Sequence, residues 1–202
     1  LAIAHPKFRG SFDPEDFTKL TGYTCIEVLN HYRTSNEAWD SALSAGRAAW
    51  ILADDDTHNS KADGETGVCW TMIATSSPHQ DSVIHALRNG RMYGVSGKHG
   101  VNQNSLVGVE THGLMCSISC EKPADSIMFI GQNGSIRHKI YNNASADYAF
   151  NANDTYIRAM IYTKEHTMWL NPIIRVNTSG LHHLHVTENG LLTWLWRLGW
   201  SV

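Results

Sequence analysis

The chain has 202 residues, of which 42% are hydrophobic and 17% are charged, as in soluble globular proteins and unlike disordered ones. Sixteen Lys and Arg residues against nineteen Asp and Glu residues leave a formal net charge of −3. No basic stripe is interleaved with aromatic residues, and no apolar run approaches the length of a membrane-spanning helix. We therefore expect neither a nucleic-acid partner nor a membrane partner.

Histidine and cysteine usage narrows the possible chemistry. Twelve histidines raise the expectation of a metal site or an acid–base site, because histidine is a common metal ligand and titrates near neutral pH. The four cysteines are scattered and form no C-x-x-C pair, which predicts buried thiols more than a disulfide framework. Such thiols are compatible with a reducing compartment, so the cytoplasm is favoured, although the sequence leaves the localisation open.

Strands and helices alternate in the first half of the chain. Apolar or β-rich runs predict strands over residues 1–4, 23–29, 48–53, 68–74 and 92–96. Capping residues and helical spacing predict helices that begin at Asp13-Pro14, at Ser35 and at Ser77-Pro78. Strands alternating with helices are typical of parallel strands joined by crossover connections. Residues 1–97 therefore read as an α/β unit.

The second half has short β-rich segments and turn residues. Residues 114–120 alternate between apolar and polar side chains, Asn133-Gly134 is a hairpin signal, and residues 156–162 form a long strand candidate. Residues 98–178 are thus predicted to form a small antiparallel β-sandwich. The last segment, 179–202, is rich in Trp and Leu and is expected to dock on the body of the protein or on a second subunit.

The sharpest chemical feature is an acidic run directly after the strand predicted over 48–53. Asp54, Asp55 and Asp56 repel one another unless a cation, a helix N-terminus or solvent compensates their charge. The spacing of Asp56 and His58 places an oxygen and a nitrogen ligand on one side of an extended segment, which suits zinc, manganese or iron. The alternative is a solvated acidic turn without a metal.

His5 is a second candidate ligand. It precedes Pro6, which restricts its backbone to extended conformations, and it also follows a predicted strand directly. Ligands of parallel α/β proteins bind beyond the carboxyl ends of the strands. His5 and the Asp56-x-His58 pair could therefore converge on one site.

These segments carry a resemblance to a known family. The segments are Ile3-Ala-His-Pro, Tyr23-Thr-Cys-Ile-Glu-Val-Leu-Asn, Ala53-Asp-Asp-Asp-Thr-His and Gly90-Arg-Met-Tyr-Gly-Val-Ser-Gly. In this order they resemble the later part of PHP-domain (polymerase and histidinol phosphatase) metallohydrolases. Tyr156-Ile-Arg-Ala and Trp169-Leu-Asn-Pro-Ile resemble the β-sandwich of the carbaryl-hydrolase-type branch. The implied fold is α/β plus all-β: a truncated PHP-type β/α barrel that lacks its N-terminal part, followed by a β-sandwich.

The resemblance also implies a function. His5, Asp56 and His58 match metal ligands of the family, whereas Glu27 does not match its bridging Glu and is not assigned. The implied protein is a hydrolase of small phosphate or carboxylic esters that uses a metal-bound hydroxide, with zinc, manganese or iron as cofactor. From their positions in loops, and not from the resemblance, Asp54 or Asp55 is expected to orient the water, and His31 or His99 to protonate the leaving group.

Several alternatives stay open. The metal ligands that the family carries in its N-terminal part have no counterpart in this sequence. The missing half could be lost or be a separate polypeptide, a second copy of the chain could complete the site, or the site could no longer bind metal. Missing barrel strands would leave an open sheet edge, which favours a homo-oligomer and above all a dimer. The competing hypothesis is a non-catalytic, oligomeric interaction module. The substrate, the leaving group and the identity and number of metals are not determined by the sequence.

Overall fold

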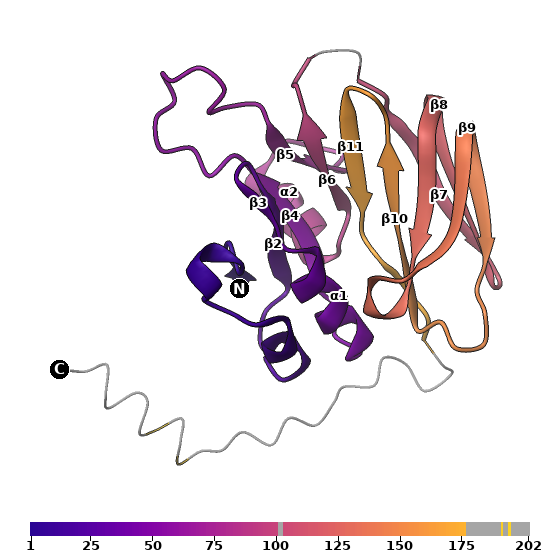
Figure 1. Cartoon of the computed structure of the whole chain (residues 1–202), viewed down its shortest axis with the longest axis horizontal. Helices are drawn as coiled ribbons and strands as arrows, with labels where there is room; N and C mark the ends of the chain where they lie inside the picture. The colour runs from indigo at the N-terminus through magenta and orange to yellow at the C-terminus, as the bar shows by residue number, and fades with distance from the viewer. Residues whose placement is uncertain (101–102, 177–190, 192–193, 195–202) are drawn as a thin grey trace.

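The computed structural model of the protein describes residues 1–100, 103–176, 191 and 194, and it contains two β-sheets (Figure 1). The smaller sheet consists of β1 (Ala2–Ile3), β2 (Cys25–Asn30), β3 (Arg33–Thr34) and β4 (Trp50–Asp54). β1 and β4 are parallel to β2 and pair with it, while β3 is antiparallel and pairs with the carboxyl end of β2. The parallel strands predicted in this part of the chain are therefore confirmed.

The smaller sheet is covered by α1 (Asn36–Ser44) and by the short 3₁₀-helix η2 (Pro14–Thr18). All six residues of β2 are buried, as expected for the central strand of a parallel sheet. Trp39 of α1 is fully buried, and its indole Nε1 donates to the Ala49 carbonyl over 2.9 Å. Phe17 of η2 is fully buried in the same core, which fixes the segment between β1 and β2 against the sheet.

The larger sheet is antiparallel and curls into a half-barrel, as Figure 1 shows at β7 to β11. Its strands are β5 (Cys69–Ile73), β6 (Met92–Gly97), β7 (Leu106–His112), β8 (Met115–Ile130), β9 (Ile136–Ala149), β10 (Tyr156–Tyr162), β11 (His166–Leu170) and β12 (Ile173–Ile174). The order runs β5-β6-β11-β10-β8-β7, and β9 pairs with the other edge of β8. The helix α2 (Gln80–Arg88) connects β5 to β6, and 3₁₀ turns lie at Phe8–Gly10 (η1) and Gln132–Gly134 (η3).

The expected fold class is wrong. Strands make up 44% of the structure and helices 18%, and the described residues form neither a partial PHP-type β/α barrel nor a separate two-sheet sandwich. β5 and β6 were expected to extend the parallel sheet, but they pair with each other in antiparallel, and β6 pairs onward with β11. The physical reason is that a helix between two strands fits either pairing direction. The partner of β6 lies about 70 residues further along the chain, where no local pattern points to it.

The side chain of Asn171 links the two sheets by hydrogen bonds. Its Oδ1 accepts from the Ile51 amide over 2.9 Å, and its Nδ2 lies 2.9 Å from the carbonyls of Gly90 and Met92. A second link joins Thr71 of β5 to Ala53 of β4, with both the Ala53 amide and the Ala53 carbonyl 2.8 Å from the Thr71 hydroxyl. β4 is therefore held beside β5 by side chains and not by strand pairing.

Two further expectations concern the C-terminal segment and a membrane-spanning helix. The segment 179–202, expected to dock, falls outside the described residues except for Leu191 and Trp194. Within the part of the chain that the structure describes, no helix combines the length and hydropathy needed to cross a membrane.

Candidate functional site

Polar side chains gather where the three parallel strands end. β1 leads to His5, β2 ends at Asn30, and β4 ends at Asp54. The register places Asn30 directly beside Asp54. Because parallel strands end at the same edge of a sheet, these groups form one surface, which we call the acidic edge: His5, Glu27, Asn30, Asp54 and Asp56.

Glu27 is the centre of the acidic edge. It is 6% exposed, and both of its carboxylate oxygens accept hydrogen bonds. The backbone amide of His5 donates to Oε2 over 2.9 Å, and the Asn30 side-chain amide donates to Oε1 over 2.7 Å. The same Asn30 Nδ2 lies 2.9 Å from Asp56 Oδ2, so two carboxylates converge on one amide nitrogen. Asn30 is itself oriented by the Tyr32 amide, which donates to its Oδ1 over 2.9 Å.

The backbone is strained on both sides of this network. His5 has a φ of 28°, so the extended backbone expected before Pro6 is wrong, and Asp56 has a φ of 49°. Both values lie in the left-handed region that non-glycine residues rarely adopt. The turn at Asp56 is held by its own amide, which donates to Asp54 Oδ1 over 2.9 Å. Strain of this kind persists only where surrounding contacts enforce it, and it clusters at functional sites.

The electrostatics of the edge favour a cation. Burial raises the pKa of Glu27, and the nearby Asp54 charge adds to this effect, while hydrogen bonds from Asn30 and His5 oppose it. Burial also raises the pKa of Asp54, with further increases from the charges of Asp56 and Asp55. Within residues 1–100 and 103–176, no Lys or Arg forms an ion pair with any of these carboxylates. Among the described residues, this negative charge is compensated by amide groups and by the neighbouring His5.

Asp55 has a different role from its neighbours. Its Oδ2 accepts from the Gly67 amide over 2.6 Å, and its Oδ1 accepts from the amides of Val68 and Cys69 over 2.8 and 2.7 Å. Burial alone would raise the pKa of Asp55, but the three amides outweigh burial and lower it. The carboxylate thus closes the loop of residues 56–66, and its predicted role in orienting a catalytic water stays a prediction.

The predicted metal ligands are placed unequally. His5 and Asp56 both belong to the acidic edge, connected through Glu27 and Asn30. His58 lies on the exposed loop beyond the turn at Asp56. Across the described ranges 1–100 and 103–176, no three His, Cys, Asp or Glu side chains stand close enough together to hold a metal ion. The set of His5, Asp56 and His58 therefore stays a prediction.

The predicted acid–base histidines lie at two places. His31 follows β2, its ring packs edge-on against Tyr32 with centroids 4.5 Å apart, and its buried Nδ1 has no hydrogen-bond partner among the described residues. His31 directly follows Asn30 of the acidic edge in the chain, and its charge contributes to the lowered pKa of Asp55. His99 is exposed and packs edge-on against Trp70 at a centroid distance of 5.0 Å.

Sequence reasoning missed the central residue of the site. Glu27 stands in the apolar run of residues 25–29, where a buried carboxylate costs free energy unless hydrogen bonds or a cation compensate it. That mismatch was the available signal. Asn30 carried no such signal, because its importance depends on two carboxylates brought to it from β2 and from the loop after β4. Comparison of the chain with protein-family models, with curated proteins and with solved structures gives no match.

Proposed function

We propose that the protein is a divalent-metal-dependent hydrolase of small phosphate or carboxylic esters and that the acidic edge holds the cation. The observation that carries the proposal is the convergence of Glu27 Oε1 and Asp56 Oδ2 on the single Asn30 Nδ2, at 2.7 and 2.9 Å. The neutral Asn30 amide compensates the charge of two carboxylates only weakly. A divalent cation placed between the carboxylates would compensate it more favourably.

The donor chemistry fits such an ion. Glu27, Asp54 and Asp56 offer carboxylate oxygens, and His5 lies close enough for its charge to lower the pKa of both Glu27 and Asp54. Carboxylates with one imidazole suit manganese, iron or zinc. Because the described side chains do not already surround a common point, cation binding is expected to draw them together.

Different residues have different proposed roles in ester hydrolysis. A bound divalent cation supplies Lewis acidity and lowers the pKa of a water molecule. His31 is the proposed donor of a proton to the leaving group, because its Nδ1 lacks a partner and its ring is held by Tyr32. Asp55 accepts hydrogen bonds from three backbone amides and so holds the two ends of the loop of residues 56–66 together. This contact is proposed to orient Asp56.

Metal content and ester turnover of one pair of variants test the proposal. The dialysed protein is expected to take up about one manganese, iron or zinc ion per chain and to hydrolyse p-nitrophenyl phosphate or p-nitrophenyl acetate. Asp54→Asn keeps the shape of an exposed side chain while removing a ligand charge, so metal affinity and turnover should both fall at least about tenfold. Asp125→Asn, an exposed charge on β8, is the matched control and should change neither. Absence of metal uptake, or equal behaviour of the two variants, contradicts the proposal.

His58 separates the two candidate ligand sets. If His5, Asp56 and His58 hold the cation as the family resemblance implies, His58→Ala should lower metal affinity as strongly as Asp54→Asn. If the cation lies between Glu27, Asp54 and Asp56, His58→Ala should leave metal affinity within about twofold, because His58 is exposed on the outer loop.

A non-catalytic, oligomeric interaction module is the second candidate function. The observation that favours it is the edge of the smaller sheet: among the described residues, β1 pairs with β2 on one side only. Such an edge offers amide and carbonyl groups to another chain. Light scattering tests this candidate, because a dimer that persists after metal removal, in a protein without ester turnover, would favour the module over the hydrolase.

A further inference from the structure

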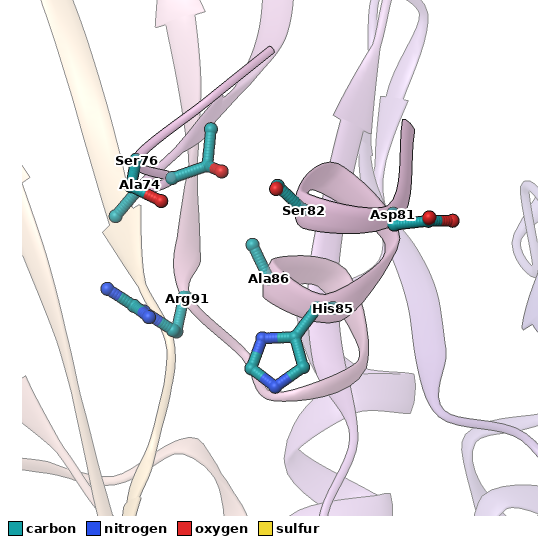
Figure 2. Close-up of a pocket in the computed structure, with 8 residues that line it drawn as sticks. Ala74, Ser76, Asp81, Ser82, His85, Ala86 and Arg91 are labelled. Atoms are coloured by element: carbon teal, nitrogen blue, oxygen red, sulfur yellow. The ribbon is translucent and has the colours of Figure 1, made fainter. Parts of the chain in front are cut away.

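A polar pocket lies between the end of β5 and α2, with a volume of about 240 Å³ (Figure 2). It is remote from the acidic edge. The amide of Cys69, the first residue of β5, contacts Asp55, whereas the pocket begins at Ala74, just past the other end of that strand. Five extended residues separate the two places by about 16 Å. The pocket is therefore a second site and not part of the first.

The backbone around the pocket is fixed by hydrogen bonds. The Ala74 amide donates to the Arg91 carbonyl over 2.8 Å, and the Arg91 amide donates to the Ala86 carbonyl over 2.9 Å. Arg91 is thus anchored both to the strand end and to the helix. Ala86 is 2% exposed, and its methyl group leaves space where a longer side chain would fill the pocket.

Hydrogen-bond donors line the pocket on both sides, and in Figure 2 the Arg91 guanidinium extends away from α2, so ligand binding requires this side chain to turn toward the helix. Ser82 and His85 lie one helical turn apart on α2, and Figure 2 shows them on the side of the helix that faces Ser76 and Arg91. No hydrogen bond or ion pair within residues 1–100 and 103–176 uses the Arg91 guanidinium, the His85 imidazole or the hydroxyls of Ser76 and Ser82. These groups are available to a ligand.

The combination of donors defines the class of ligand. We propose that this pocket binds a phosphate group, either as inorganic phosphate or on a phosphorylated small molecule. The guanidinium of Arg91 presents paired N–H groups that match two phosphate oxygens, and the serine hydroxyls and His85 can donate to the remaining oxygens. Among the described residues that line the pocket, Asp81 is the one carboxylate, and in Figure 2 its side chain extends away from Arg91.

Calorimetric titration of the full chain with inorganic phosphate and with phenyl phosphate tests the proposal. EDTA in the buffer keeps any metal at the acidic edge from binding the phosphate, and sodium chloride at equal ionic strength is the reference anion. Arg91→Gln is expected to weaken phosphate binding about tenfold or more, because it removes a charge-assisted bidentate contact. Ser82→Ala should weaken it by a few fold, and Asp81→Asn should strengthen it.

Arg88→Gln is the matched control. Arg88 belongs to the last turn of α2 and is exposed but does not line the pocket, so its removal changes the net charge equally. It should leave phosphate affinity within about twofold. Equal losses in Arg88→Gln and Arg91→Gln, or phosphate binding no tighter than chloride binding, would overturn the proposal. Tighter binding of phenyl phosphate than of inorganic phosphate would identify a phosphorylated small molecule as the ligand, and equal binding would identify free phosphate. Circular dichroism confirms that each variant is folded.

Discussion

The carboxylate of Asp40 and the guanidinium of Arg158 form a bidentate ion pair across the junction of α1 and β10. Arg158 Nε lies 2.8 Å from Asp40 Oδ1, and Nη2 lies 2.7 Å from Oδ2. Both residues are buried, at 5% and 3% exposure. The Tyr156 hydroxyl lies 3.0 Å from the same Asp40 Oδ1, and the guanidinium lies 4.9 Å from the centroid of the Trp39 ring. The pair therefore fastens the helix of the smaller sheet to a central strand of the larger one.

Removing one partner of this pair should be costly. Asp40→Ala leaves a buried guanidinium without its carboxylate, and we expect it to lower the free energy of unfolding by about 3–5 kcal/mol in urea denaturation. The double variant Asp40→Leu/Arg158→Met removes both charges and is expected to cost less than Asp40→Ala alone. A double variant that is at least as unstable as the single one contradicts this account of the junction.

Gly134 is expected to be required beside the same carboxylate. Its φ is +70°, and a Cβ built on it would lie 2.8 Å from Asp40 Oδ2. Gly113 has a similar φ of +61° with no atom within 4 Å, so it shares the backbone penalty without the clash. Gly134→Ala should therefore be less stable than Gly113→Ala by about 1–3 kcal/mol in urea denaturation. Equal losses would show that only the backbone conformation matters at Gly134.

Asp55→Asn should destabilise the protein in a pH-dependent way. The pKa of Asp55 is lowered in the folded state, so its ionised form contributes stability above the ordinary value of 3.8 and this contribution is lost as the pH falls through the lowered value. The asparagine cannot satisfy three amides equally, and we expect a loss of about 2 kcal/mol at neutral pH. Denaturation at several pH values should show the difference shrinking in acid. A difference independent of pH contradicts the role given to the charge.

Glu27 should show the opposite pH dependence. Its pKa is raised in the folded state, so its contribution to stability is fully present below the ordinary value of 4.5 and is lost as the pH rises through the raised value. The stability of Glu27→Gln, measured by thermal unfolding, should therefore fall less between acidic and neutral pH than the stability of the natural chain. Glu121→Gln, an exposed residue of β8, is the control and should follow the natural chain. Parallel curves for Glu27→Gln and the natural chain would mean that burial of Glu27 carries no electrostatic cost.

The four cysteines should be unreactive in the folded protein. All are buried and free, as the scatter of the cysteines in the sequence predicted. Burial raises the pKa of Cys116 to about 11 and also raises the pKa of the other three thiols, so little thiolate is present at neutral pH. Titration with a thiol reagent is expected to be slow in buffer and to count four thiols in urea. A rapidly reacting thiol in buffer would contradict this expectation.

Local patterns identified the elements better than their arrangement. The strand expected over 23–29 and the helix expected from Ser35 match β2 and α1, because apolar runs and helical spacing act within the segment itself. The helix expected at Asp13-Pro14 is a short 3₁₀-helix that carries a capping box between Asp13 and Asp16. Pairing was harder to predict, because the direction of β5 against β6 depends on β11, which joins the sheet from far along the chain.

The candidate site divides in the same way. The acidic run of residues 54–56 is visible in the sequence, but its three carboxylates have separate environments that only the fold creates. Asp55 faces the returning amides of residues 67–69, whereas Asp56 faces Asn30. Glu27 becomes central because β1 brings the His5 amide to it, a contact between residues 22 positions apart.

The sequence by itself determined most of the strands and helices of residues 1–97, that the thiols are buried, and that carboxylates and His5 follow the strand ends. These features depend on side-chain periodicity and on neighbours in the chain. The tertiary structure decided that a curled antiparallel sheet replaces the expected barrel and sandwich, that Asn30 lies between two carboxylates, and that Arg91 lines one pocket together with residues of α2. Those features depend on long-range pairing and burial, in which many weak contacts between distant segments are balanced against the entropy of closing the chain.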